Sequence, residues 1–173
     1  MDTKTLGTAL LGGAVAGMAG TVAMDLVGFR RAKRAGAEES FSEWEFTVAT
    51  SFDDAGAPAQ IAAKAASAIG VDIPERQAGT ISNVVHWATG AGWGIASSMF
   101  GASVGMPSLA RGLVAGAAAF GGAYTILPML GIYDPLWDYD GKTLWKDASA
   151  HATYGVVTGS ALAAINAVVR TGR

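Results

Sequence analysis

The chain has 173 residues and a net charge of −2, with 51% hydrophobic residues and only 15% charged ones. Charged residues make up about a quarter of an average soluble domain, so this composition argues against an ordinary water-soluble protein. The sequence contains no cysteine, which excludes disulfide bonds and thiolate metal sites.

Four long stretches of the sequence are nearly free of charge. Three of them, residues 77–110, 112–133 and 148–169, contain no Asp, Glu, Lys or Arg. The fourth, residues 6–29, contains only Asp25. A membrane-spanning helix needs about 20 mainly apolar residues, and each stretch is long enough. We therefore predict a single integral membrane domain over 1–173, an all-α bundle of four transmembrane helices. The spans are expected at about 6–29, 80–102, 110–131 and 148–169.

The alternative is a soluble, alanine-rich helical bundle with many glycines inside its helices. In water each of these glycines would cost about 1 kcal/mol relative to alanine. In a bilayer, glycines let helix backbones approach closely, and they are frequent in membrane helices. The first stretch ends in the basic segment Arg30–Arg34, which is typical of a stop-transfer signal rather than of a cleaved leader.

The first link, residues 30–79, is predicted to be a helical insertion with two short helices. Ser42-Glu-Trp-Glu45 fits a capping box at the start of the first one. Its apolar face would be made of Phe41, Trp44, Val48 and Phe52. The second helix would begin near Pro58 and stop at Gly70. The first piece would lie either on the membrane surface or against the end of the bundle.

The distribution of Lys and Arg predicts the orientation in the membrane. Eight of these residues lie in the first and third links, and four lie in the N-terminus, the second link and the C-terminus. This bias puts both long links in the cytoplasm and both termini outside. Four aromatic residues of the third link are typical of an interfacial belt: Tyr133, Trp137, Tyr139 and Trp145.

Two glycine patterns occur twice. A Gly-x3-Gly pair lies in the first span and again in the third, and a His-x3-Gly-x3-Gly pattern lies in the second span and again in the fourth. The residues of the pair are Gly13, Gly17, Gly112 and Gly116, and those of the histidine pattern are His86, Gly90, Gly94, His151, Gly155 and Gly159. Two copies of one hairpin are therefore predicted, related by a parallel repeat about an axis along the membrane normal.

The spacing of the histidine pattern puts each histidine on the same helical face as its glycines. Because glycines mark the closely packed side of a membrane helix, both histidines are predicted to point into the bundle. They should meet in its cytoplasmic half, with Cα atoms within about 15 Å. The candidate site comprises Asp25, His86, Tyr124 and His151, with Asn83 and Tyr154 nearby.

Four roles for this polar layer stay open at the level of sequence. Its side chains would fix helix packing through hydrogen bonds, or handle protons or other ions. The two histidines would otherwise ligate a haem. The last alternative is a divalent metal on His86, His151 and Asp25.

No phosphate-binding loop or complete catalytic motif accompanies the layer, so we expect a protein that is not an enzyme. An accessory or structural membrane protein, or a subunit of a larger membrane complex, is the leading prediction. The alternatives are a small proton- or ion-handling transporter and a bis-histidine haem protein. The expected partners are the lipid bilayer and a larger membrane complex or a second copy of the chain, and no nucleic acid.

Three features together resemble the YagU-like family of small bacterial inner-membrane proteins. They are the glycine-rich first span that ends in Asp25 and a basic stretch, the H-W-x2-G motif at His86, and the H-x2-Y-G motif at His151. The resemblance covers most of the chain. It implies a multi-pass helical protein of the bacterial inner membrane with a link to acid tolerance, and it carries over no catalytic residue.

Overall fold

The computed structural model describes residues 3–46 and 49–171, and within these ranges the protein is all-helical, without a strand. Helices make up 80% of it, which confirms the predicted all-α class. The described α-helices are α1 (Thr3–Arg34), α2 (Phe41–Glu45), α3 (Ala57–Ala68), α4 (Ala78–Ser103), α5 (Ser108–Met129) and α6 (Gly141–Thr171). Two 3-10 turns, η1 (Glu75–Gln77) and η2 (Leu136–Asp138), complete the set.

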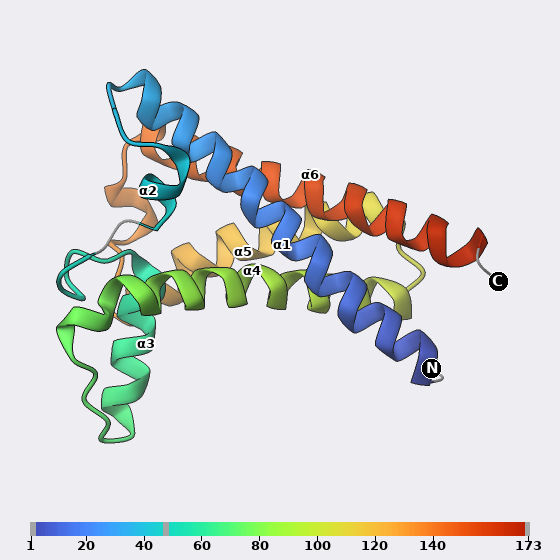
Figure 1. Ribbon diagram of the computed structural model, residues 1–173, viewed down its shortest axis with the longest axis horizontal. Coiled ribbons are helices and arrows are strands. Elements are labelled where there is room, and N and C mark those ends of the chain that lie inside the picture. Colours follow the sequence, from blue (N-terminus) through green and yellow to red (C-terminus); the bar gives the residue numbers. More distant parts are fainter. Residues whose placement is uncertain (1–2, 47–48, 172–173) are drawn as a thin grey trace.

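The four long helices pack along one another and the short ones gather at one end (Figure 1). Helix α1 lies against α4 and α6, and α5 lies against the same two helices. Both chain ends and the α4–α5 turn are at one end of the molecule, whereas α2, α3 and the α5–α6 link are at the other. We call α1 with α4 the first hairpin and α5 with α6 the second hairpin.

Three of the long helices are long and apolar enough to cross a membrane: Leu6–Arg34 of α1, all of α5 and all of α6. Large apolar side chains are exposed along them. On α1 these are Leu6, Leu10, Leu11, Val15, Met18, Val22 and Leu26, and on α5 they include Leu109, Leu113, Val114 and Ile126. Apolar stripes of this length are unusual on soluble monomers and suit contact with lipid. These features indicate a membrane protein.

Within each hairpin the two helices touch at glycines. A Cβ atom added to Gly13 would lie 2.7 Å from the Ile95 Cα atom, and one added to Gly94 would lie 2.6 Å from the Gly17 Cα atom. In the second hairpin, a Cβ atom on Gly155 would lie 2.7 Å from the Gly112 carbonyl oxygen. All eight glycines assigned to helix packing are buried: Gly13, Gly17, Gly90, Gly94, Gly112, Gly116, Gly155 and Gly159. The backbones therefore approach too closely for any side chain between them.

The two hairpins pack closely where α1 meets α6, since a Cβ atom on Gly20 would lie 2.9 Å from the Tyr154 carbonyl oxygen. The Tyr154 hydroxyl of α6 donates a hydrogen bond of 2.7 Å to the Gly90 carbonyl of α4. On the α1 side, Gly20 leaves room for this tyrosine, since a Cβ atom there would lie 2.8 Å from its ring. Tyr154 is only 3% exposed. A single buried tyrosine thus joins α6 to both helices of the first hairpin.

Helix ends differ from the predicted spans where polar caps extend the helices. Helix α6 begins at Gly141, well before the expected residue 148. The Asp140 carboxylate accepts hydrogen bonds from the Lys142 N–H (2.8 Å) and the Thr143 N–H (3.0 Å). An N-terminal cap of this kind stabilises the first turn of a helix, so charged and polar residues continue the helix beyond its apolar part.

The insertion contains two short helices, but the predicted capping box was wrong by two residues. The box is formed by Ser40 and Glu43: the Ser40 N–H donates to Glu43 (2.8 Å), and the Ser40 hydroxyl accepts from the Glu43 N–H (3.4 Å). Helix α2 ends at Glu45. Of its predicted apolar face, Val48 lies outside the described residues.

Phe52 is not on α2 either, which corrects the predicted four-residue face. It is buried with Ala55, Ala59 and Ala78 where α3 meets α4. Phe41 and Trp44 do pack inward, with ring centroids 5.4 Å and 5.8 Å from that of Phe29 on α1. Helix α2 therefore lies against the bundle. The second short helix agrees with the sequence, because α3 has Pro58 in its first turn and Gly70 follows it at φ +75°.

The glycine contacts predict opposite effects for two substitutions one helical half-turn apart. Gly94→Ala should destabilise the protein by about 1–3 kcal/mol, because the added methyl group would push α1 and α4 apart. Gly92→Ala is the matched control, since a Cβ atom there meets nothing within 4 Å. It should be neutral or slightly stabilising because alanine favours a helix. Thermal unfolding in detergent measures both, and equal losses of stability would contradict the packing described.

Candidate functional site

The first polar group joins three helices at the end of the bundle that carries the insertion. His86 of α4 places its Nε2 atom 3.1 Å from each carboxylate oxygen of Asp25 on α1. An ionised carboxylate only accepts hydrogen bonds, so this nitrogen carries the hydrogen. Asp25 is buried, with 9% of its side chain exposed, against 28% for His86. Two of the predicted site residues therefore form a direct pair.

Glu45, the last residue of α2, completes this group. Together with Asp25 and His86 it offers ligand atoms that all lie within 4.8 Å of one another. The Trp87 indole N–H donates a hydrogen bond of 3.1 Å to Glu45. Burial, helped by the nearby Asp25 carboxylate, raises the pKa of Glu45. We refer to Asp25, Glu45 and His86 as the triad.

The second polar group belongs to α6 and α5. The Nδ1 atom of His151 lies 3.0 Å from the Asp147 carbonyl oxygen and 3.1 Å from its carboxylate. Because both oxygens accept, Nδ1 carries the hydrogen and leaves Nε2 free to accept another. The ring also packs edge-on against Phe120, with centroids 5.7 Å apart. His151 thus has a carboxylate partner of its own, one helical turn earlier in the same helix.

Tyr124 lies in the second group and not beside Asp25. It is buried, its ring contacts Phe120 at 4.9 Å, and its hydroxyl interacts with Asp147. Tyr133 and Tyr139 pack on it at centroid distances of 5.5 Å and 5.3 Å. Burial raises the pKa of Tyr133. The four-residue layer expected from the sequence is therefore divided into two groups, one in each hairpin.

The four residues of the predicted aromatic belt also fall into two sets, one exposed and one turned inward. Trp137 and Trp145 are 83% and 70% exposed, as residues at a membrane interface would be. Tyr133 and Tyr139 instead turn inward to form the tyrosine cluster with Tyr124. A tyrosine ring carries a polar group at one end, so it serves at an interface or inside a polar cluster equally well.

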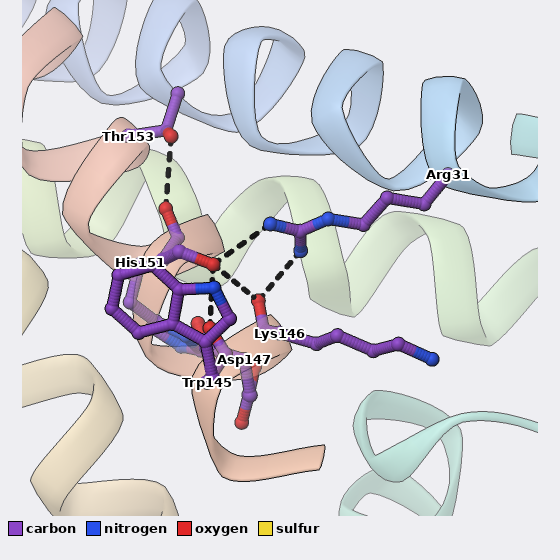
Figure 2. Close-up of polar contacts among 7 residues, drawn as sticks. Arg31, Trp145, Lys146, Asp147, His151 and Thr153 are labelled. Atoms are coloured by element: carbon purple, nitrogen blue, oxygen red, sulfur yellow. Dashed lines mark hydrogen bonds and ion pairs between the residues drawn. The ribbon is translucent and has the colours of Figure 1, made fainter. Parts of the chain in front are cut away.

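Arg31 connects the second group to α1 (Figure 2). Its guanidinium donates to the Lys146 carbonyl oxygen (2.7 Å) and to the Ser149 hydroxyl (2.8 Å). Both acceptors flank Asp147 in the first turns of α6. A basic residue that signalled topology in the sequence therefore also holds the two hairpins together at this end.

A cavity of about 410 Å³ separates the two polar groups. His86 and Trp93 of α4 line one wall, and Asp147, His151 and Tyr154 of α6 line another. Helices α1, α3 and α5 supply mainly apolar residues: Thr21, Met24, Ala57, Pro58, Ile61, Ala119, Gly122, Ala123, Ile126 and Leu127. The volume is within the range of small-molecule sites, about 300–1,000 Å³. Both histidines reach this single cavity.

Two functional residues were missed at the level of sequence. Asp147 stands four residues before His151, a spacing that places both on one helical face, and this signal was available in the sequence. Glu45 carried no such signal, because its approach to Asp25 depends on how α2 docks. Asn83, expected near the layer, lines a polar hollow together with Glu45. The predicted distance between the histidine Cα atoms stays a prediction.

Helix composition and exposed apolar faces place the chain in the class of helical membrane proteins. No protein-family model matches it, and no curated protein or solved structure is significantly similar to it. The resemblance to the YagU-like family therefore stays a prediction.

The Arg31 contacts predict a loss of stability when this side chain is shortened. Arg31→Ala should lower the free energy of unfolding by about 1 kcal/mol, because two charge-assisted hydrogen bonds are lost at a partly solvated site. Arg30→Ala is the matched control, since the neighbouring Arg30 side chain is exposed. Thermal melting in detergent should show a lower midpoint for Arg31→Ala alone. A similar shift for both variants would show that general charge, rather than this contact, matters.

Proposed function

We propose that the protein is a four-span membrane protein that binds a small, mainly apolar molecule between its two hairpins. The observation that carries this proposal is the cavity with one histidine on each side. Ligand sites are typically apolar clefts with a few well-placed polar groups, and those built at the interface of two repeated units are common in membrane transport proteins.

The fourth span in this proposal is α4. It has 26 residues, so it is about 39 Å long, which exceeds the hydrocarbon thickness of about 30 Å. It contains no Asp, Glu, Lys or Arg, and it lies against α1 through glycines. Exposed Val84, Met99 and Phe100 would face the bilayer.

The parallel repeat is the second structural element of the proposal. In the first hairpin Gly13 and Gly17 face Gly90 and Gly94, and in the second hairpin Gly112 and Gly116 face Gly155 and Gly159. In each case a histidine stands four residues before the first of these packing glycines, Gly90 in α4 or Gly155 in α6. Glycine contacts that recur in both hairpins support two copies of one unit with the cavity between them. The register differs between the copies, because Gly17 lies nearest the Gly90 carbonyl oxygen whereas Gly116 lies nearest that of His151.

The chemistry of the walls defines the class of ligand. Most of the lining is aliphatic or aromatic, so the body of the ligand is apolar. His151 leaves its Nε2 atom free to accept a hydrogen bond, because its Nδ1 atom is held by Asp147. His86 is held in the same manner by Asp25 through Nε2. A small molecule with a hydroxyl or another N–H or O–H donor therefore fits the cavity.

The membrane location and orientation belong to the same proposal. The end that carries α2, α3 and the α5–α6 link holds most of the basic residues, so it faces the cytoplasm of a bacterial inner membrane. The wild-type chain has no cysteine, so a single introduced thiol reports its own location. Gly56 directly precedes α3 and Val104 lies in the α4–α5 turn, and both are exposed. Helix α3 and the α4–α5 turn lie at opposite ends of the molecule (Figure 1).

Accessibility labelling should separate these two positions. In intact inverted vesicles, whose outer face is the cytoplasmic one, a membrane-impermeant maleimide should label Gly56→Cys and spare Val104→Cys. In intact cells without an outer membrane the pattern should reverse. The opposite pattern would invert the orientation, and equal labelling of both thiols in both preparations would argue against a membrane-spanning bundle.

Ligand binding is tested by closing the cavity. Gly122 lines it and Gly121 is an exposed residue beside it, and a Cβ atom on either one meets nothing within 4 Å. Gly122→Leu should fill the cavity without disturbing the backbone, whereas Gly121→Leu adds the same side chain outside. A diazirine derivative of octanol, photolysed with the purified protein, should label cavity residues such as Trp93 and Tyr154. We expect Gly122→Leu to reduce this labelling about tenfold and Gly121→Leu to leave it unchanged.

Other outcomes of these experiments favour the other predicted functions. Labelling confined to outward-facing residues in every variant would reject the ligand site and leave the accessory or structural role. A proton or ion flux measured in proteoliposomes would favour a transporter if the double variant His86→Ala, His151→Ala folds normally but abolishes that flux. A Soret band of the purified protein would favour bis-histidine haem ligation, which would require each ring to rotate away from its carboxylate.

A further inference from the structure

We propose that the triad of Asp25, Glu45 and His86 binds one divalent transition-metal ion. The three side chains come from α1, α2 and α4, and they converge at the insertion end of the bundle. This proposal does not depend on the ligand of the inter-hairpin cavity, because only His86 belongs to both.

The distances within the triad suit a shared metal. In tetrahedral or octahedral sites with bonds of about 2.0–2.2 Å, neighbouring ligand atoms are about 3.0–3.5 Å apart. The His86 Nε2 atom lies 3.1 Å from each Asp25 oxygen. The ligand atoms of the three side chains all lie within 4.8 Å of one another. Binding of a metal would draw the three ligand atoms together, with Glu45 half-buried at the end of α2.

The position of Glu45 is fixed by contacts that do not involve the other two ligands. Its neighbour Trp44 packs on α1, where a Cβ atom on Gly28 would lie 2.9 Å from the indole ring. Trp87 donates a hydrogen bond to one Glu45 oxygen, and the Glu45 carboxyl group also lies beside Asp25. Hydrogen bonds from outside the ligand set are a regular feature of metal sites, because they orient the ligating groups.

Charge also favours a cation at this place. The triad holds two carboxylates and one imidazole, and among the described residues no lysine or arginine forms an ion pair with either carboxylate. The Nε2 hydrogen of His86 is the present partner of Asp25. A metal would take the place of this hydrogen, and the neutral imidazole would then carry its hydrogen on Nδ1.

The chemistry of the three ligands selects the ion. One imidazole nitrogen with carboxylate oxygens suits Zn²⁺ or Mn²⁺, whereas Mg²⁺ and Ca²⁺ prefer oxygen ligands alone. An entry route exists on the aqueous side. A polar hollow of about 400 Å³ leads to Glu45 and is lined by Asp54, Ser82 and Asn83 among others. Water would fill the remaining coordination positions from this hollow.

This ligand set differs from the one considered at the level of sequence. His151 is held by Asp147 in the second hairpin and is not in the triad, and Glu45 takes its place. The exchange provides a matched control, because His151 lines the same cavity as His86 but should not bind the metal.

The test is equilibrium dialysis of tag-free protein in detergent against Zn²⁺, with elemental analysis of the metal content, and electron paramagnetic resonance with Mn²⁺. We expect one ion per chain. Glu45→Gln and His86→Gln should each weaken binding about tenfold or more. Glu45→Gln is the more informative variant, because a half-buried residue at the end of a short helix can be changed with little effect on folding.

Two controls should retain the affinity of the wild-type protein. One is His151→Gln. The other is Glu43→Gln, because Glu43 lies on α2 but outside the triad. Gly122→Leu should also bind metal normally, so that failure of the cavity proposal and failure of the metal proposal are distinguishable. Absence of a stoichiometric ion at about 100 µM free Zn²⁺ or Mn²⁺ would overturn the metal site, as would equal binding by wild type and Glu45→Gln.

Discussion

Direct contact between helix backbones at glycine is the constraint on which the rest of the structure depends. Gly17 meets Gly90 in the first hairpin, and Gly116 meets Gly155 in the second. This contact sets the register of each helix pair, and the register in turn sets the depth of the polar residues. Asp25 and Tyr124 each follow the α1 or α5 glycine by eight residues, and each histidine precedes its glycine by four. The two registers are not identical, because Gly17 lies nearest the Gly90 carbonyl oxygen whereas Gly116 lies nearest that of His151.

The two hairpins arrange their polar residues differently. In the first, the carboxylate beside the histidine comes from the neighbouring helix, so the His86–Asp25 pair joins α1 to α4. In the second, it comes from the preceding turn of the same helix, and Tyr124 occupies the position across the hairpin. The first group is completed from the insertion by Glu45 of α2. The insertion therefore contributes an ionisable side chain to one of the two polar groups.

Features that depend on local sequence were predictable, and features that depend on docking were not. The long uncharged stretches and the spacing of the glycines can be read directly from the sequence. They predicted the helical class and the inward direction of His86 and His151. The insertion was harder because two overlapping Ser-x-x-Glu patterns, at Ser40 and Ser42, fit a capping box equally well. Packing of Phe41 on Phe29 accompanies the first choice. That choice leaves Glu45 free of capping and turns it toward Asp25, which no local pattern could indicate.

The buried tyrosine between the hairpins has a consequence for the shape of the cavity. Inside each hairpin the backbones interlock, because no side chain fits between them at the glycines. The same close fit continues from α1 to α6, where a Cβ atom on Gly20 would lie 2.9 Å from the Tyr154 carbonyl oxygen. The Tyr154 hydroxyl also holds α6 to the Gly90 carbonyl of α4. Tyr154 therefore gives the cavity a wall whose position is fixed relative to α1 and α4.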